Sequence, residues 1–222
     1  MTSLRVTGGA LRGRRVPVPA GEVRPTSERA RQAYFNIVSD RLPGARFLDL
    51  FAGSGVFSFE ALSRGAAAAL AVEQNERQCA LIEQTAAAFG VEVTAVAGDA
   101  IGVVSNLARP HFALRADLSK DRGPKRSGYP SADHARRASQ RPASSGSPAL
   151  PSAAPFDLVY ADPPYEYSRY DELVDAIAAA PLAVDALVAI EHRRRTEPFQ
   201  ETVLRQTRRA EYGEVWITFF ER

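Results

Sequence analysis

The sequence predicts an α/β fold with a mostly parallel sheet, and three features lead to this prediction. Short apolar segments alternate with helical segments along much of the chain, as in strands that are joined by crossover helices. One apolar segment, FDLVY at residues 156–160, is nearly continuous, which is typical of a strand buried on both faces of a parallel sheet. A glycine-rich segment, DLFAGSG at residues 49–55, lies between a predicted strand and a predicted helix, where open α/β sheets bind ligands. With 222 residues, 45% of them hydrophobic, the chain is long enough for one principal domain.

The first 45 residues are predicted to form a basic extension that precedes this domain. Residues 4–18, LRVTGGALRGRRVPV, read as two short strands around the glycines, which is a basic ribbon. Thr26 is well placed to cap a helix through SERARQAYFNIVSDRL. The apolar face of that helix is expected to consist of Ala30, Ala33, Tyr34, Ile37 and Val38.

The central segments continue the alternation of strand and helix. RFLDL reads as a strand that leads through the glycine-rich turn into a helix ending at Gly65. A strand in AAALAVEQ, a helix from NERQ to Gly90 and a strand in VEVTAVAGD follow. After FDLVY come a helix in YDELVDAIAAA and a strand in ALVAIEH. TVLRQTRRAEY and GEVWITFFER, divided at Gly213, predict a terminal β-hairpin.

Residues 109–155 break this pattern. Seven of the 15 prolines of the chain lie here, together with serine-rich and alanine-rich stretches that show no sustained periodicity. We therefore expect a mobile surface insertion whose basic residues could contact nucleic acid.

Composition excludes several classes of protein. The single cysteine, Cys79, rules out an internal disulfide framework, and with three histidines there is no CxxC or HExxH spacing, so we expect no metal. No run of 18 apolar residues and no signal-peptide core occur, so we expect a cytoplasmic protein without membrane association.

The charge is distributed in blocks. Residues 1–46 carry nine arginines and three acids, and residues 109–155 carry nine basic and three acidic residues, whereas residues 47–108 and 156–222 are each net acidic. A polyanion partner for the N-terminal block is therefore plausible. The alternative is coding bias, because 26 of the 28 basic residues are arginine.

The glycine-rich loop favours S-adenosylmethionine over a dinucleotide. Gly53 and Gly55 let the backbone approach a ligand, and the following helix N-terminus favours hydrogen-bond acceptors. Asp49 would repel a pyrophosphate but suits the ammonium group of a cofactor that carries an amino acid. Phe51 lies in the same loop and is a further candidate cofactor contact.

Two further acids end predicted strands and fit the same cofactor. Glu73 lies about twenty residues beyond the glycines, where a carboxylate can accept hydrogen bonds from both ribose hydroxyls. Asp99 ends the next strand and could accept from the adenine amino group. The alternative reading is that a carboxylate merely closes a strand or caps a helix, and it applies most directly to Asp99.

The segment Asp162-Pro163-Pro164-Tyr165 is suited to hold a methyl acceptor. Exocyclic base nitrogens are poor nucleophiles because their lone pair is delocalised into the ring. Asp162 and the Pro163 carbonyl can each accept one N–H, which leaves the lone pair aimed at the sulfonium methyl group. The prolines fix the backbone, and Tyr165 offers a stacking face worth ~1–3 kcal/mol. Alignment of nitrogen, methyl and sulfur would supply roughly 7–11 kcal/mol. The alternative is a turn that only ends the strand.

A target base in paired nucleic acid would have to be flipped out to reach such a pocket. A single-stranded loop would be an easier substrate.

The order of these motifs resembles the RsmD family, bacterial methyltransferases that modify N2 of a guanine in 16S ribosomal RNA. The resemblance rests on RVTGGALRGRRVPVP, RPTSERARQAYFNIV, FLDLFAGSGVFSFEALSRGA, AVEQN, GDA and DLVYADPPY, and it covers nearly the whole chain except residues 109–155. Many amino-methyltransferases share DPPY and the glycine loop, whereas GGxxRGR and RPT followed by a basic helix are far more specific.

The resemblance implies a class I methyltransferase domain over residues 46–222, with a seven-stranded sheet whose last strand is antiparallel. It implies a small-subunit particle as the substrate and gives Asp49, Gly53, Gly55, Glu73 and Asp99 to the cofactor. Asp162, Pro163, Pro164 and Tyr165 would hold the guanine. The ribbon and the RPT segment would grip RNA and cover the site, so that Thr26 is a cofactor candidate. The RNA-binding candidates are Arg12, Arg14, Arg15, Arg24 and Arg29.

Three other functions remain open at this point. A DNA adenine-N6 methyltransferase can carry the same DPPY, but the chain shows no separate module of the size needed to read DNA sequence. Protein-glutamine methyltransferases usually present Asn before Pro-Pro-Tyr. A non-catalytic RNA-binding or assembly factor could retain the fold alone. We expect a monomer that uses S-adenosylmethionine and no metal.

Overall fold

The computed structural model describes residues 2–18, 28–109, 154–164, 166–194 and 203–222. All of them belong to one compact unit, Met1–Phe112 with Ala153–Arg222. Arg24, Thr26, Tyr165 and nearly all of the predicted insertion lie outside the described residues. The mobility of the insertion therefore remains a prediction. The domain boundary after residue 45 also remains a prediction.

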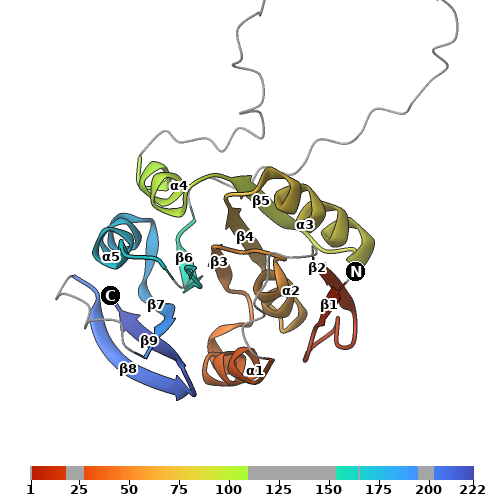
Figure 1. Cartoon of the computed structure of the whole chain (residues 1–222), viewed down its shortest axis with the longest axis horizontal. Coiled ribbons are helices and arrows are strands. Elements are labelled where there is room, and N and C mark those ends of the chain that lie inside the picture. The colour runs from red at the N-terminus through yellow and green to blue at the C-terminus, as the bar shows by residue number, and fades with distance from the viewer. Residues whose placement is uncertain (1, 19–27, 110–153, 165, 195–202) are drawn as a thin grey trace, which may run out of the picture. The chain divides into compact units, whose positions relative to one another are not determined.

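A seven-stranded sheet forms the centre of the unit (Figure 1). Its order is β5 (Val93–Ala97), β4 (Ala68–Glu73), β3 (Arg46–Leu50), β6 (Phe156–Ala161), β7 (Leu182–Arg193), β9 (Val215–Glu221) and β8 (Arg205–Tyr212). Neighbours from β5 to β7 pair in parallel, and β9 is antiparallel to both β7 and β8. The mostly parallel sheet with an antiparallel last strand is thus confirmed. Because the chain moves outward from β3 to β5 and then returns to β6, the direction of winding changes between β3 and β6, where doubly wound sheets bind ligands.

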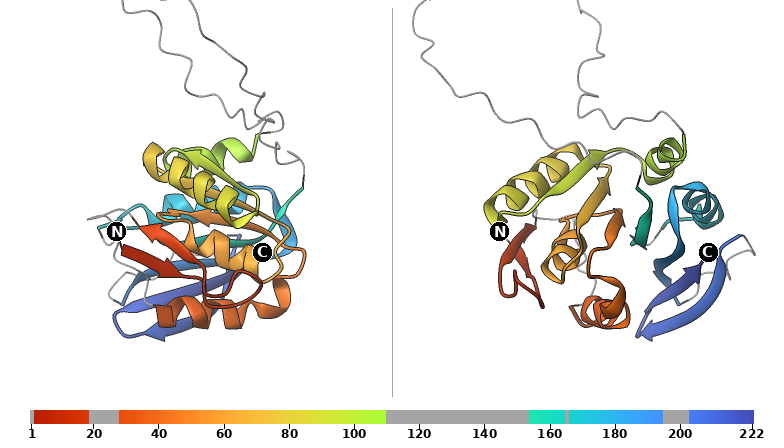
Figure 2. Two further views of the ribbon diagram at one scale, coloured as in Figure 1. Left: turned by 90° about the vertical axis from the view of Figure 1, so that its right-hand side faces the viewer. Right: turned by 180° about the vertical axis from the view of Figure 1, so that it is seen from behind.

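Five α-helices cover the two faces of the sheet in the described residues. Figure 1 shows α1 (Glu28–Ile37), α2 (Val56–Ser63) and α3 (Glu76–Phe89) along one face, and α4 (Ala100–Leu107) and α5 (Tyr170–Ala179) along the other, and Figure 2 shows the same layers from two further sides. Four of them were expected. The sequence reading missed α4, which is only eight residues long and begins at the predicted strand-end acid Asp99.

The boundaries of α1 and α3 show how local chemistry sets helix ends. Helix α3 has its N-cap at Asn75, whose side chain accepts from the Arg77 N–H, and ends at Gly90 in the left-handed conformation, as predicted. Helix α1 is shorter than predicted because the chain passes at Ile37 into a 3-10 turn, Ser39–Arg41. Ser39 and Asp40 favour such a turn, since short polar side chains compete for hydrogen bonds with the helical backbone.

The buried face of α1 differs from the predicted one. Ala30, Tyr34 and Val38 are buried as expected, whereas Ala33 and Ile37 are only half-buried. Arg31 and Phe35 are fully buried in their place, which turns the face toward the row formed by residues 31, 34, 35 and 38. The prediction was wrong here because arginine is almost never fully buried unless it is paired; Arg31 is paired with the buried Glu60.

The N-terminal ribbon consists of β1 (Thr2–Arg5) and β2 (Arg15–Val18), which pair in antiparallel fashion as predicted. Its connecting loop packs closely on α2: the Ala10 N–H donates to the Ser63 carbonyl at 2.7 Å, and the Leu11 N–H donates to Ser63 Oγ at 2.8 Å. A Cβ atom at Gly9, whose φ is +73°, would lie 1.7 Å from the Ser63 carbonyl oxygen. The second glycine of GGxxRGR is therefore required for the contact between ribbon and helix.

Candidate active site

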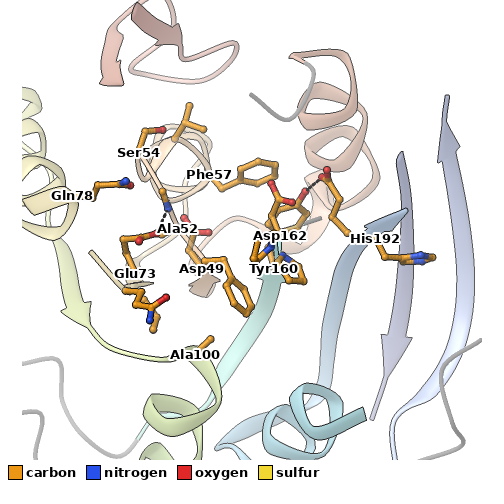
Figure 3. A pocket seen from close by; sticks show the side chains of 18 of the residues that line it. Asp49, Ala52, Ser54, Phe57, Glu73, Gln78, Ala100, Tyr160, Asp162 and His192 are labelled. Atoms are coloured by element: carbon orange, nitrogen blue, oxygen red, sulfur yellow. Dashed lines mark hydrogen bonds between the residues drawn. The ribbon is translucent and has the colours of Figure 1, made fainter. Parts of the chain in front are cut away.

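A cavity of about 570 Å³ opens at the carboxyl end of the parallel strands (Figure 3). Its wall includes the ends of β3, β4, β6 and β7 and the turn after β5. The volume lies within the range of ligand-binding pockets, roughly 300–1,000 Å³. Of the described site candidates, Asp49, Phe51, Gly53, Glu73, Asp99, Asp162, Pro163 and Pro164 all line it. The structure thus brings together candidates from four separate strand ends.

Strand register explains why the acidic side chains converge. Asp49 is paired with Ala71 on β4 and with Tyr160 on β6, and Tyr160 is paired with Ala189 on β7. Residues two apart on a strand share a face. Glu73, Asp162 and Glu191 each follow one of these paired residues by two positions, so they and Asp49 belong to the same face at the same end of the sheet.

Asp49 is buried beneath the glycine loop, with 2% of its surface exposed. Its Oδ2 accepts hydrogen bonds from the Ser58 N–H at 3.0 Å and from Ser58 Oγ at 2.7 Å. Burial raises the pKa of Asp49 to about 7 although these two hydrogen bonds lower it, and the nearby carboxylates of Asp162 and Glu73 add to the rise. Asp49 therefore titrates near neutral pH and responds to any cation placed in the cavity.

Glu73 and the glycine loop hold each other in place. Glu73 Oε2 accepts from the Gly53 N–H at 2.8 Å (Figure 3), and Oε1 accepts from the Asn75 N–H at 2.9 Å. The loop itself is tightly turned: Phe51 has a φ of 60°, which is unusual for a residue other than glycine. At Gly55, φ is +73° and an added Cβ would lie 3.0 Å from Ile82, so only glycine fits there without displacing α3.

Asp99 has the structural role that the alternative reading assigned to it. It is the N-cap of α4, and its Oδ2 accepts from the Gly102 N–H at 3.0 Å. Its Oδ1 lies 3.7 Å from a guanidinium nitrogen of Arg169, and about half of its side chain is exposed. Asp99 still lines the cavity, so that the cap and a contact to a ligand are compatible.

The DPP segment continues β6 past its last ladder residue. The Asp162 N–H donates to the Leu50 carbonyl at 3.3 Å, and the Pro164 carbonyl accepts from the Tyr167 N–H at 2.8 Å. Pro163 is buried and Pro164 is exposed. Tyr165, the predicted stacking residue, lies outside the described residues. Tyr170 also lines the cavity, although the sequence did not single it out. Its ring meets that of Tyr167 edge-on, with the ring centroids 5.2 Å apart.

Three more of the residues that line the cavity extend the candidate site. Tyr160 donates to Glu191 Oε2 at 2.6 Å, and both line the cavity, as does the fully buried Arg31. Glu191 had a signal in the sequence, because it ends a predicted strand in the same way as Glu73. Tyr160 and Arg31 had none: an aromatic residue in an apolar strand and an arginine in a helix are ordinary features.

The described RNA-binding candidates lie on the ribbon and, in the case of Arg29, on α1, and all four are exposed. The Arg14 guanidinium donates to the Ala88 carbonyl at 2.8 Å and lies over the Phe89 ring at 4.5 Å, and Arg15 donates to Ser3 Oγ at 3.1 Å. Arg14 thus joins the ribbon to the end of α3, whereas no hydrogen bond or ion pair links the Arg12 side chain to any other residue that the structure describes.

No three His, Cys, Asp or Glu side chains within the described part of the chain are grouped so that they could hold a metal ion. None of its helices is both long enough and apolar enough to span a bilayer.

Comparison with known proteins places the fold among methyltransferases. A solved Escherichia coli structure described as a candidate methyltransferase, yhhF, superimposes with a TM-score of 0.70 at 24% identity, over 100% of this chain and 98% of that one. Together with the sheet order, this establishes a class I S-adenosylmethionine-dependent methyltransferase fold.

Relatives also match at the level of sequence. Ribosomal RNA small subunit methyltransferase D of Escherichia coli K12 is 35% identical over 122 residues, which cover 54% of this chain and 62% of that protein. YlbH of Bacillus subtilis strain 168, described as a candidate rRNA methyltransferase, is 27% identical over 99% of both chains.

The family model named Conserved hypothetical protein 95 matches residues 4–114 and 134–221. Both matched ranges include candidate site residues, from the ribbon and the glycine loop in the first to the DPP segment and Glu191 in the second. This match spans most of the chain, and the sequence motifs, the sheet order and the relatives agree with it: the protein belongs to the RsmD family of methyltransferases.

Proposed function

We propose that this protein transfers a methyl group from S-adenosylmethionine to the exocyclic N2 amine of a guanine in 16S ribosomal RNA. One observation carries the proposal: the glycine loop with its two acids and the Asp162-Pro163-Pro164 segment line the same cavity. The relatives named as rRNA methyltransferases support ribosomal RNA as the acceptor, and we infer that the RNA is presented within a small-subunit particle. We also propose that the protein acts as a monomer.

The residues around the glycine loop fit the cofactor. Both oxygens of Glu73 are oriented by backbone N–H groups, which leaves further lone pairs for the two hydroxyls of a ribose. Asp49 supplies a carboxylate for an ammonium group, and only its Oδ2 is engaged by other described residues. Asp99 also lines the cavity and would accept from the adenine amino group. When bound, the cofactor supplies a methyl group on a positively charged sulfur.

The acceptor side performs the chemistry that the amine needs. Asp162 and the Pro163 carbonyl each accept a hydrogen bond from one N–H group of the exocyclic nitrogen and so orient its lone pair. Transfer of the methyl group to the nitrogen would leave the nitrogen cationic and make its protons acidic. Asp162 stabilises this developing charge and receives the proton or passes it to solvent.

The proposal is tested by incubating the purified full chain with S-adenosylmethionine labelled in the methyl group and three acceptors: small subunits, naked 16S RNA and duplex DNA. Nucleoside analysis should recover the label as N2-methylguanosine from RNA. Label in N6-methyladenine from DNA would show that the partner is wrong. Cofactor binding without transfer to any of the three acceptors would favour an assembly factor that has kept only the fold.

The pKa of Asp49 gives a prediction for cofactor binding. Because an ionised Asp49 attracts the ammonium group, the affinity should fall as the pH falls through about 7 and Asp49 takes up a proton. We expect S-adenosylhomocysteine, which carries the same amino-acid portion, to bind roughly fivefold to tenfold more weakly at pH 6 than at pH 7.5. Titration calorimetry in buffers of different ionisation enthalpy should also show proton release on binding at pH 7. Asp49→Asn should weaken binding and abolish both effects; an unchanged pH profile in this variant would assign them to another group.

The arginines of the ribbon give a prediction for RNA binding. Arg12→Ala should lower RNA affinity about twofold to fivefold and reduce the slope of log affinity against log salt by about 1, because one phosphate contact is lost. Arg14→Ala should lower affinity by more, since it also releases the ribbon from α3. Arg41→Ala is the matched control: Arg41 contacts Asp185 and Glu221 at the opposite end of the parallel strands. If Arg12→Ala leaves the salt slope of the wild type unchanged, the ribbon does not contact phosphate.

A further inference from the structure

A second acidic side chain lies on the acceptor side of the cavity, and the methyl-transfer chemistry described above does not use it. Glu191 lies near the end of β7, in the strand next to the one that leads to Asp162, and it lines the cavity although only 6% of its surface is exposed. Burying a carboxylate is unfavourable unless it is hydrogen-bonded or pairs with a ligand. Glu191 is held by a hydrogen bond within the protein and also lines the cavity, where a bound ligand can meet it.

Tyr160 fixes the orientation of this carboxylate. The Tyr160 hydroxyl donates to Glu191 Oε2 at 2.6 Å, within the buried interior. The Tyr160 ring is itself held by the aromatic core. It is stacked on Phe57, with ring centroids 3.9 Å apart, and packed against Tyr34, with ring centroids 4.7 Å apart. Glu191 thus keeps one position, from which it cannot turn away without losing a buried hydrogen bond.

Register places Glu191 beside the group that would hold the target amine. Ala161, the last residue of β6, pairs with Ile190 on β7, so Asp162, which directly follows β6, and Glu191 are the next residues after this pair. Asp162 follows Tyr160 by two positions, and Glu191 follows Ala189 by two positions. Both therefore belong to the face of the sheet that carries Tyr160 and Ala189. Adjacent strands lie about 4.8 Å apart, which is a spacing at which two carboxylates can contact neighbouring atoms of one base.

We propose that Glu191 reads the Watson–Crick edge of the target base by accepting the N1–H of guanine while Asp162 accepts from the N2 amine. This inference rests on the proposed function, and it assigns the selectivity of that site. Guanine presents two adjacent donors, N1–H and N2–H, to which a pair of acceptors is complementary. In 2,6-diaminopurine and 2-aminopurine the N2 amine is kept, but N1 is an acceptor and would face the Glu191 carboxylate. Adenine likewise presents an acceptor N1 beside its amine.

Base analogues test this directly on the wild-type protein. Acceptor RNAs of one sequence should carry guanine, 2,6-diaminopurine, 2-aminopurine or inosine at the target position. Inosine keeps N1–H but lacks the N2 amine, so it should accept no methyl group. We expect kcat/KM for 2,6-diaminopurine and 2-aminopurine to be about 10- to 100-fold lower than for guanine, because each loses a charge-assisted hydrogen bond and meets a repulsive contact. Equal use of guanine and 2,6-diaminopurine by the wild type would overturn the proposal without any variant.

Glu191→Gln separates this role from a purely structural one. Its amide can donate to an acceptor N1, so the preference for guanine over 2,6-diaminopurine should fall at least about tenfold or reverse. A structural defect would instead lower kcat/KM for both bases in proportion and leave their ratio unchanged, which would contradict the proposal. Tyr160→Phe keeps the aromatic ring and the Glu191 carboxylate but removes the hydroxyl that orients this carboxylate. It should therefore also lower the preference for guanine over 2,6-diaminopurine. It serves as the second variant if Glu191→Gln does not fold.

Failure of this inference differs from failure of the proposed function. If the wild type methylates guanine in RNA but its preference for guanine over 2,6-diaminopurine is unchanged in Glu191→Gln and Tyr160→Phe, the proposed function stands and the role of Glu191 is refuted. A wild-type protein that transfers no methyl group to any RNA guanine would refute both.

Discussion

Asp162→Ala is expected to lower kcat for methyl transfer by on the order of 10³-fold or more while the affinity for S-adenosylhomocysteine stays within about threefold. The variant loses the carboxylate that orients the amine and stabilises its developing charge; removing one such preorganised group costs about 10²- to 10³-fold, and misplacement of the amine adds to this loss. Cofactor affinity is expected to survive because Glu73 and Asp49 do not depend on Asp162 for their hydrogen bonds. The substitution also removes the negative charge of Asp162, which is one of the causes of the raised pKa of Asp49.

Two companion variants make this result specific. Asp162→Asn keeps one carbonyl oxygen as an acceptor, so it should retain more activity than the alanine variant while remaining well below the wild type. Asp175→Ala removes an exposed carboxylate from α5 and should leave both kcat and cofactor affinity unchanged. Single-turnover transfer to the RNA acceptor and calorimetric titration of the cofactor product measure the two quantities. Activity of Asp162→Ala within a few-fold of the wild type would mean that another group holds the amine.

The strand-end acids were predictable because a parallel sheet turns spacing in sequence into proximity. Asp49, Glu73 and Asp99 each end an apolar strand followed by a helix, and the carboxyl ends of such strands meet at one edge. The sequence could also identify the glycine loop and the DPP segment, since glycine and proline restrict the backbone in known ways. Most of the described residues that these signals identify line one cavity, although Gly55 is not among its lining residues, and their binding roles remain predictions.

Other features depended on long-range contacts that no local pattern encodes. The burial of Arg31 follows from Glu60, 29 positions away, and the orientation of Glu191 follows from Tyr160, 31 positions away. The hydrogen bond between Gly53 and Glu73 likewise forms only after β3 and β4 have paired. Helix α4 was missed for a different reason: it is only eight residues long, and although a helix cap was one alternative for Asp99, no helix was predicted after it.

The loss of Glu60 should strongly destabilise the fold. It is fully buried on α2, and its Oε1 accepts from the Thr7 N–H at 2.6 Å and from Thr7 Oγ1 at 2.7 Å. The same oxygen lies 3.3 Å from Arg31 Nε, and Oε2 lies 3.1 Å from Arg64 Nε. One carboxylate therefore connects the ribbon, α1 and α2.

Glu60→Ala should lower the free energy of unfolding by about 3–5 kcal/mol, because it leaves the Arg31 charge buried without its counter-ion. Arg31→Met should cost less: it removes the buried cation together with its need for a partner, and Glu60 keeps Arg64 and Thr7. Glu83→Ala, which removes an exposed acid from α3, should change stability by no more than about 0.5 kcal/mol. Guanidinium unfolding of the full chain measures all three.

The double variant Glu60→Ala with Arg31→Met decides between a charge effect and a packing effect. If the unpaired guanidinium causes the loss, the double variant should be more stable than the sum of the two single effects predicts, by about 1–3 kcal/mol. Simple addition would mean that the cost lies in the cavity and in the unsatisfied Thr7 groups. The distinction has a functional consequence, because Glu60 fixes the ribbon that carries Arg12 and the helix whose Arg31 lines the cavity. A coupled ion pair would make the proposed RNA-binding ribbon and the wall of the active site parts of one cooperative unit.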